Sequence, residues 1–353
     1  MPTETELLER ARALVPSLRK RAQATEEARR LLPATLSDFQ KAGFYRIAQP
    51  RRYGGYQLSP EVLFKVAMEI ARGCPSSAWC LCLIGVHNWE PGLMDVQTAE
   101  DLWGKDDSAR YSSSYAPFGK VEVVEGGYRL SGRWEWSSGS DHCSWVMLGA
   151  VLPASEEDKP PVQIAMLVPR EDYQVIDNWH VAGLKGTGSN DIVVNNALIP
   201  EHRTHRLTAP GKRAFDDPIY DLPFGNVFAL CLCAVTQGIA EAALENYSDY
   251  LRSRLHKYDG QPMALDPFQQ RRLSEVATEV QANRQRFHMV FRRLEGALEN
   301  SLTVPLSVQV EQSWETQVIA HHNADLVTKL MRASGGGAQR LEHPMQRYFR
   351  DVN

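Results

Sequence analysis

The chain has 353 residues, and its 39 Lys and Arg against 43 Asp and Glu give a formal net charge of −4. The two signs are interspersed and no basic run resembles a nucleic-acid or anionic-membrane footprint, so we expect neither kind of partner and favour a small-molecule ligand. A chain of this length is expected to form two or three packed layers around a core large enough for a ligand pocket.

The N-terminal segment is polar and charged through Arg30 and lacks the apolar core of a signal peptide. The apolar runs at residues 78–86 and 227–235 are too short to span a bilayer. We therefore expect a cytoplasmic protein that makes no membrane contact.

Residues 1–107 are predicted to form a helical domain. Apolar side chains recur at helical spacing from Leu7 to Leu14 and again from Leu36 to Phe44. The tripeptide Ser59-Pro60-Glu61 then supplies an N-cap, a proline for the first turn and an early acid. The helix that begins there is expected to run to about Gly73.

Residues 108–207 are predicted to form a β-domain, because the apolar period changes from that of a helix to two. Alternating residues flank a turn at Glu125-Gly126-Gly127, and β-branched runs recur at 162–168 and 192–194. These patterns indicate an antiparallel hairpin and at least two further strands.

Residues 208–353 are predicted to form a helical bundle. Helical spacing resumes after Pro223 and continues through Leu251, and it returns from about Pro267 to Leu298 and from Pro305 to Ala333. Three long helices with short connections favour an antiparallel bundle. Its apolar surfaces, residues 227–235 included, are expected to be buried in a homotetramer.

The order of helices, strands and helices, without βαβ alternation, indicates an α+β fold. No GxGxxG motif follows a predicted strand, and the nearest match, residues 183–188, has its glycines in the wrong order. The chain is therefore not expected to bind a nicotinamide, and electrons for any redox chemistry must arrive on another carrier.

The cysteine spacing matches neither zinc ligation nor a redox CxxC motif, and buried free thiols are expected. The six cysteines are Cys74, Cys80, Cys82, Cys143, Cys231 and Cys233. The histidines lack a carboxylate cluster at metal-site spacing, so we predict no metal.

Segments spread along the whole chain resemble the acyl-CoA dehydrogenases and their relatives. They are Leu36–Phe44, Arg52–Gly55, Gly127–Gly139, Gly183–Ser189, Ile199–Pro200, Gly335–Gly337 and His343–Asp351. The resemblance implies the acyl-CoA dehydrogenase fold: an N-terminal helical domain, a middle β-barrel-like domain and a C-terminal four-helix bundle.

Three segments resemble one branch of that superfamily, the group D flavin monooxygenases: Arg72–Trp79, Gly85–Trp89 and Ser137–His142. This branch includes the oxygenase components of 4-hydroxyphenylacetate 3-hydroxylase and of the steroid-degradation phenol hydroxylase. The resemblance implies an oxygenase component that receives diffusible reduced FMN or FAD from a separate flavin reductase. It also implies reaction with O2 through a C4a-hydroperoxyflavin and ortho-hydroxylation of a small phenolic substrate.

Two other functions stay open, an acyl-thioester dehydrogenase and a flavin-free relative that serves as a structural or ligand-binding oligomer. The dehydrogenase is disfavoured because residues 112–119 contain no acid where that family has a Gly-Ser-Asp element, and because Phe228 stands where one catalytic glutamate is found. In related oxygenases another histidine follows the final Arg-Asp pair. Whether one follows Asn353 here is left open.

Ser138 is the first choice and Ser137 the second for a hydroxyl that bonds flavin N5, because the resemblance makes their strand the flavin-facing one. Strand alternation turns only one of them toward the ring. Trp136 is expected to pack on the ring as an apolar wall. The competing interpretation of these residues is a polar strand end before a turn.

Further flavin contacts follow from the same resemblance. The residues expected in a turn at the pyrimidine edge are Ser113, Ser114 and Tyr115. Those that allow close backbone approach are Gly186, Thr187 and Gly188. Those expected at the flavin phosphate are Arg254 or Lys257, together with Gly336 from a neighbouring subunit.

His87 is the candidate base. Oxygen transfer to a phenol is electrophilic, so removal of the phenolic proton raises the electron density of the ring, and an imidazole suits that task. Trp79 lies two helical turns earlier on nearly the same face, so both side chains are expected to line the pocket. A histidine that only bonds a neighbouring helix is the equally weighted alternative.

Overall fold

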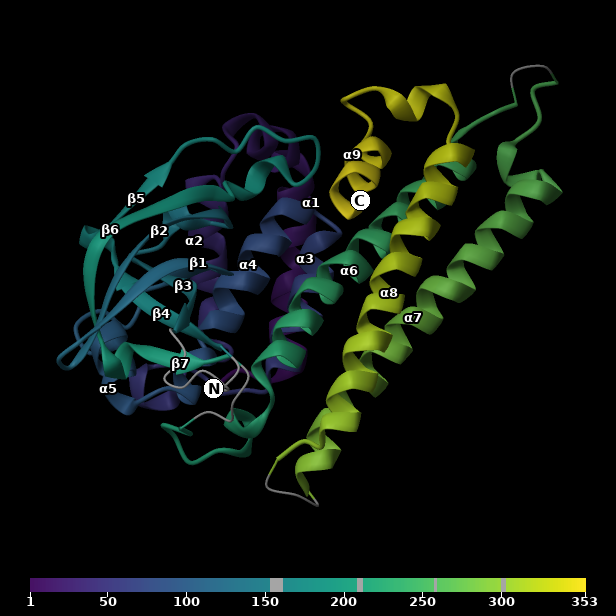
Figure 1. The fold of residues 1–353 in the computed structure, drawn as a ribbon. Coiled ribbons are helices and arrows are strands. Elements are labelled where there is room, and N and C mark those ends of the chain that lie inside the picture. Colours follow the sequence, from purple (N-terminus) through teal and green to yellow (C-terminus); the bar gives the residue numbers. More distant parts are fainter. Residues whose placement is uncertain (153–160, 208–211, 257–258, 300–302) are drawn as a thin grey trace.

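The computed structural model describes residues 1–152, 161–207, 212–256, 259–299 and 303–353. Figure 1 shows a β-sheet on one side, long C-terminal helices on the other, and N-terminal helices between them. The N-terminal helices are α1 (Glu4–Ala28), α2 (Pro33–Ala42), α3 (Pro60–Ala71), α4 (Pro75–His87) and α5 (Val96–Trp103). The predicted order of helices, sheet and bundle is confirmed.

Local signals explain where α3 begins. The Ser59 hydroxyl accepts a hydrogen bond from the Glu61 backbone N–H, and Pro60 occupies the first turn, as predicted. The helix ends at Ala71, close to the predicted end at Gly73. A short turn then leads into α4, whose residues are buried on nearly every face. Helix α4 is thus a central element between the sheet and the bundle.

Within the part of the chain that the structure describes, the sheet has seven strands in the order β5-β6-β2-β1-β3-β4-β7. The strands are β1 (Tyr111–Val124), β2 (Gly127–Ser137), β3 (Trp145–Leu152), β4 (Val162–Pro169), β5 (Tyr173–Ile176), β6 (Asn190–Pro200) and β7 (Thr204–Arg206). The first half of β1 pairs in parallel with β3, and its second half pairs with β2 across the predicted turn. Because β1 belongs to both halves, it bends the sheet toward the expected barrel-like form.

The predicted turn at Ser113, Ser114 and Tyr115 is wrong, because these residues lie inside β1. Backbone pairing of Ser113 and Ser114 with Met147 and Leu148 of β3 satisfies their hydrogen bonds without any turn. The irregularity comes later, between Ser114 and Gly119, where the register shifts.

The C-terminal bundle contains α6 (Phe224–Ser253), α7 (Pro267–Glu299), α8 (Leu306–Ala333) and the short α9 (Pro344–Val352). Helix α6 packs on α3 and α4, so the N-terminal and C-terminal helices share one apolar core. The division of the chain after residues 107 and 207 stays a prediction, because this shared core crosses it.

The expectation that a partner subunit covers residues 227–235 is wrong. Val227, Leu230, Ala234 and Val235 are buried inside the protomer, where α6 contacts α3 and α4. Within the described residues, α6 has the length and apolarity of a membrane span, but 67% of its most apolar window is buried in the protein. This burial is that of a core helix.

All six cysteines are buried free thiols, as predicted. Cys82 of α4 and Cys231 of α6 lie with their Sγ atoms 3.1 Å apart in the shared core. Burial holds the pKa of the Cys231 thiol well above its usual range, so this thiol is neutral.

Candidate active site

Helix α4 carries two polar side chains that reach the β-domain from its two ends. Trp79 Nε1 donates to Ser138 Oγ over 3.0 Å, and His87 Nδ1 lies 3.2 Å from the Tyr115 hydroxyl. Both residues therefore face the sheet, as their spacing of about two helical turns predicts. The two contacts define two clusters, one around Ser138 and one around His87.

The first cluster is a chain of hydroxyls that fixes the direction of the Ser138 proton. Thr187 Oγ1 donates to the Leu184 carbonyl over 2.9 Å. The Thr187–Ser189 contact of 2.6 Å therefore needs a proton from Ser189, and the Ser189–Ser138 contact of 2.8 Å needs one from Ser138. The Ser138 oxygen also accepts from Trp79, and it keeps one further lone pair with which to accept a hydrogen bond.

The strand end beside this cluster is irregular. Pairing of β2 with β6 shifts register between Trp134 and Ser137, and Trp136 has a positive φ of 67°. Trp136 is turned outward with 69% of its surface exposed. Ser137 is fully buried and bonds Ser112 Oγ over 2.9 Å, whereas Ser138 keeps 7% exposure.

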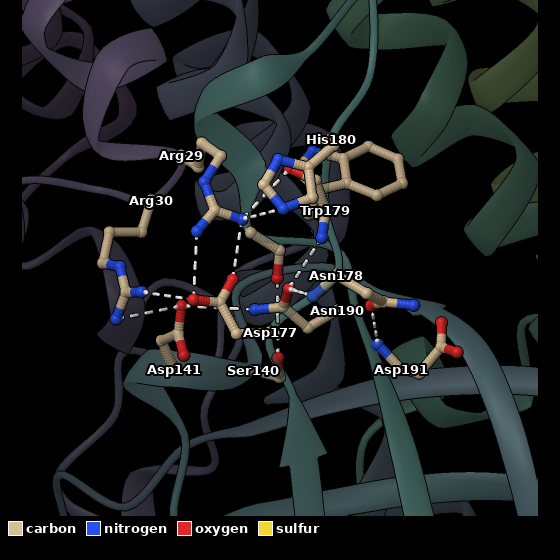
Figure 2. A network of polar contacts seen from close by, with 11 residues as sticks. Arg29, Arg30, Ser140, Asp141, Asp177, Asn178, Trp179, His180, Asn190 and Asp191 are labelled. Atoms are coloured by element: carbon tan, nitrogen blue, oxygen red, sulfur yellow. Dashed lines mark hydrogen bonds and ion pairs between the residues drawn. The ribbon is translucent and has the colours of Figure 1, made fainter.

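The loop that supplies Thr187 and Ser189 is held by a polar network (Figure 2). The Arg29 guanidinium makes two hydrogen bonds to Asp177, of 2.7 and 3.0 Å. Asn190 Oδ1 accepts from the backbone N–H groups of Asn178 and Trp179. These contacts tie the C-terminal end of α1 to the segment that leads into β6, so the loop is fixed at both of its ends.

The glycines of this loop serve packing. The Gly186 N–H donates to Ser76 Oγ over 3.2 Å, and a Cβ at Gly186 would lie 2.5 Å from Thr25 Cγ2. Gly188 has a φ of +53°, which glycine adopts without strain. The close backbone approach seen here is to α1 and α4, and the flavin contact expected of Gly186, Thr187 and Gly188 stays a prediction.

The loop is also anchored by Asp351 of α9, whose Oδ1 accepts the Leu184 backbone N–H over 2.7 Å. Burial raises the pKa of this carboxyl to about 7 from an ordinary value of 3.8, and the nearby Glu26 charge adds to the effect. Because the folded chain holds this proton when the unfolded chain has released it, the contribution of Asp351 to stability falls as pH rises from about 4 to about 7.

Asp351→Asn is therefore expected to raise the melting temperature at pH 8 by several degrees and to leave it nearly unchanged near pH 4. The asparagine oxygen still accepts from Leu184, so the loop anchor is retained. Calorimetry of both proteins across this pH range measures the effect. A melting temperature that is lower in the variant at pH 8 would contradict it.

The second cluster surrounds Glu90, a fully buried carboxylate in the turn after α4. His205 Nε2 lies 2.7 Å from its Oε1, and the Tyr115 hydroxyl donates to Oε2 over 2.7 Å. The Tyr111 hydroxyl lies 2.9 Å from Oε2 and also contacts the His87 backbone carbonyl, so these two acceptors share its single proton. His87 Nδ1 lies 3.3 Å from the same Oε2. Burial alone would raise the pKa of Glu90, but hydrogen bonds with His205 and His87 lower it to about 2.

His87 has one nitrogen without a partner. Its Nδ1 faces Glu90 and Tyr115, but its buried Nε2 has no hydrogen-bond partner among the described residues. The ring stacks between Tyr111 and Phe228, at centroid distances of 4.9 and 6.0 Å. Phe224 packs beside Phe228, so aromatic side chains surround this histidine.

The predicted phosphate contacts lie apart from both clusters, on the bundle. Arg254 and Gly336 line one open depression, where the Arg254 guanidinium also stacks over Tyr250 at 5.0 Å. Arg340 and His343 also line it, and burial and the Arg254 charge lower the pKa of His343, so the two arginines supply its positive charge. Lys257 lies outside the described residues.

The searched part of the chain contains no group of three His, Cys, Asp or Glu side chains that could hold a metal ion. In the Glu90 cluster, the His205 nitrogen bonds the carboxylate directly at 2.7 Å, which leaves no room for an ion between them. The expectation of a metal-free site stays a prediction.

The sequence patterns did not reveal the Glu90 cluster. Glu90 follows His87 by three residues, a spacing that brings side chains together at a helix end and could have suggested the pair. His205 comes from a distant strand and Ser189 from a loop, and no local pattern connects either residue to α4.

Comparison with known proteins supports the same fold. The acyl-CoA dehydrogenase N-terminal domain matches residues 1–90, and the acyl-CoA dehydrogenase C-terminal domain matches residues 230–353. The HsaA oxygenase subunit of a flavin-dependent monooxygenase from Rhodococcus jostii is 35% identical over 98% of this chain and 92% of that protein. The chain belongs to this family of flavin-dependent monooxygenase oxygenase subunits.

One further relative and one solved structure agree with this assignment. The oxygenase component of p-hydroxyphenylacetate 3-hydroxylase from Acinetobacter baumannii is 30% identical over 98% of this chain and 83% of that protein. The crystal structure of 3-HSA hydroxylase from Rhodococcus sp. RHA1 superimposes with a TM-score of 0.91, at 35% identity over 98% of this chain and 91% of that one. The predicted acyl-CoA dehydrogenase fold and monooxygenase branch are thus confirmed.

Proposed function

We propose that this chain is the oxygenase component of a two-component monooxygenase that hydroxylates a phenolic substrate with reduced flavin and O2. The observation that carries the proposal is the pair of clusters on α4, a hydroxyl acceptor at Ser138 and an unpartnered imidazole nitrogen at His87. Eight residues of helix separate Trp79 from His87 by roughly 12 Å along the axis, so a flavin contact at one end and a phenol contact at the other would be distinct.

The Ser138 cluster fits a reduced flavin. When bound, reduced flavin supplies the two electrons with which one atom of O2 enters the substrate and the other becomes water. Its N5–H is a donor, and Ser138 offers the lone pair that its hydroxyl neighbours leave unused. The exposed Trp136 offers an aromatic face next to that contact.

The His87 cluster fits the phenol. A neutral imidazole with a free Nε2 accepts the phenolic proton, and the aromatic residues around it exclude water. Phe228 stacks on this imidazole, so the position of a dehydrogenase glutamate is apolar here. This contact favours oxygenation over abstraction of a thioester α-proton.

The flavin is reduced FMN or FAD, delivered by a separate flavin reductase through diffusion or transient contact. The depression lined by Arg254 and Gly336 is suited to the flavin phosphate, because its guanidinium groups and backbone offer donors to an anion. A cytoplasmic location is part of the proposal, because reduced flavins and their reductases are found there.

A homotetramer is part of the proposal. Leu306, Val310 and Trp314 follow each other at four-residue spacing on α8 and are 61–73% exposed. Such a stripe lies on one helix face and would be buried by a second copy of the bundle. Analytical ultracentrifugation tests this assembly, and a monomer would contradict it.

The decisive experiment is turnover with a generic flavin reductase, NADH, O2 and a panel of phenols, with either FMN or FAD. We expect a catechol-type product whose formation requires both the reductase and this chain. Bleaching of bound oxidised flavin by an acyl-CoA, with no phenol product, would instead indicate the dehydrogenase. Failure to bind either reduced flavin would favour the flavin-free alternative.

Ser138→Ala is expected to increase the fraction of reduced flavin that is lost as hydrogen peroxide by several-fold, because one buried hydrogen bond contributes about 0.5–1.5 kcal/mol. Peroxide and product are measured in the same assay. Ser334→Ala removes a buried hydroxyl that bonds only the Leu330 carbonyl and serves as the control. A larger effect in Ser137→Ala than in Ser138→Ala would reverse the assignment of the N5 contact.

A further inference from the structure

The buried Glu90 carboxylate belongs to neither the flavin contact nor the base of the proposed reaction. We propose that Glu90 is a positioning residue that holds His87 in the tautomer with its proton on Nδ1, so that Nε2 is free to take the proton of a phenol. The inference rests on the proposed function, since it names how the candidate base is prepared for that substrate.

The carboxylate is placed to impose this tautomer. Both Glu90 oxygens face hydrogen-bond donors: His205 lies on Oε1, and Tyr115 and His87 lie on Oε2. The Tyr111 hydroxyl also lies on Oε2, but it shares its single proton with the His87 backbone carbonyl. Burial and the adjacent Glu90 charge raise the pKa of Tyr115 well above its usual range, so this phenol keeps its proton and donates a hydrogen bond to Glu90 Oε2. The Tyr115 oxygen that faces His87 is therefore an acceptor.

His87 Nδ1 consequently meets only acceptors, the Glu90 carboxylate at 3.3 Å and the Tyr115 oxygen at 3.2 Å. A proton on Nδ1 satisfies both, whereas a lone pair there would oppose two other lone pairs. The neutral imidazole must then carry its lone pair on Nε2. The spacing of His87 and Glu90 in the sequence does not reveal this tautomer, because the second acceptor that faces Nδ1 is Tyr115 of β1.

The Nε2 atom of His87, on the opposite side of the ring, supports the same tautomer. Nε2 is buried without a hydrogen-bond partner among the described residues, and a buried polar atom without a partner is uncommon in a folded protein. A ligand hydroxyl would supply the missing partner. The flanking rings of Tyr111 and Phe228 favour an aromatic ligand.

The proton transfer balances with these groups alone. The O–H bond of the phenol breaks, an N–H bond forms at His87 Nε2, and a phenolate remains beside an imidazolium whose charge faces the Glu90 anion. The titratable groups on neighbouring elements are Tyr111 and Tyr115 of β1, His205 of β7 and Cys231 of α6. Tyr111, Tyr115 and Cys231 are held neutral by burial, so Glu90 supplies the stabilising negative charge.

The test uses 4-nitrophenol as an optical probe, because its phenolate absorbs visible light and its neutral form does not. The probe is titrated into the full-length protein without flavin at several pH values between about 5 and 9. The wild type is expected to bind it as phenolate at pH values where the free probe is mostly neutral. Glu90→Gln is expected to raise the apparent pKa of the bound probe by about one unit or more.

Glu69→Gln is the matched control, because Glu69 of α3 is also buried but pairs with Arg12 and Arg72, away from the site. It is expected to cost stability and to leave the probe spectrum at its wild-type value. If Glu90→Gln does not fold, Glu90→Asp retains the charge and withdraws it by one methylene. The apparent pKa of the probe should then lie above that of the wild type.

The outcomes separate this inference from the proposed function. A probe spectrum in Glu90→Gln, or in a folded Glu90→Asp, that matches the wild type overturns the positioning role even when the wild type hydroxylates phenols. Failure of the wild type to bind 4-nitrophenol at all counts against the phenol site and thus against both. Ionisation of the probe by the wild type but not by Glu90→Gln supports the inference whether or not hydroxylation is observed.

Discussion

His87→Ala is expected to lower the rate of product formation by roughly 100-fold or more, the contribution typical of a positioned general base. Flavin binding should persist, because His87 lies at the opposite end of α4 from the Ser138 contact. Reduced flavin and O2 would still react, and hydrogen peroxide would replace the hydroxylated product. Oxygen uptake, peroxide and product measured together give the coupling ratio.

His288→Ala is the matched control for this variant. His288 Nδ1 lies 2.9 Å from Glu61 Oε1, so it is also a histidine paired with a glutamate, but between α7 and α3. We expect its coupling ratio to equal that of the wild type. Equal coupling in His87→Ala and His288→Ala would remove His87 from the mechanism.

Trp136→Ala is expected to weaken binding of reduced flavin by about 30-fold, which corresponds to the loss of about 2 kcal/mol of aromatic contact. The fold should be unaffected, because the indole buries little of its surface within the chain. A second variant, Trp136→Gly, would also relieve backbone strain, because glycine adopts the positive φ of this position more easily. Anaerobic titration with reduced FMN and FAD measures the affinity.

Phe118→Ala provides the comparison for Trp136→Ala. Phe118 is an aromatic residue of β1 with 57% of its surface exposed. Within the described residues, it makes no contact with the Ser138 cluster. We expect its flavin affinity to match that of the wild type. A similar loss in both variants would point to a general effect of surface aromatics rather than to stacking on the ring.

The fold was largely predictable because its signals are local. The cap at Ser59, the hairpin turn at Glu125-Gly126-Gly127 and the long helical repeats of the bundle each act over a few residues. The error at Ser113–Tyr115 has the opposite origin. Serines tolerate turns and strands alike, and pairing with β3, a contact distant in sequence, decided the outcome.

The candidate site was predictable only in part. Trp79, His87 and Ser138 were identified from short segments, and the structure connects Trp79 with Ser138 directly. The protonation pattern was not accessible, because it depends on Glu90 and His205 meeting in space and on a run of hydroxyls from two segments. Direction of a hydrogen bond is a property of the assembled network, and residue identity alone does not encode it.

Trp79 and His87 lie on one helix, which limits how this site can evolve or be engineered. Because α4 is a regular helix, it fixes the distance between the flavin contact and the base. Movements of the sheet do not change that distance. Inserting a single residue between them would rotate one end by about 100° relative to the other. The size of the substrate that fits should therefore depend on side chains of α6 that face α4, such as Phe224 and Phe228, and not on the length of α4.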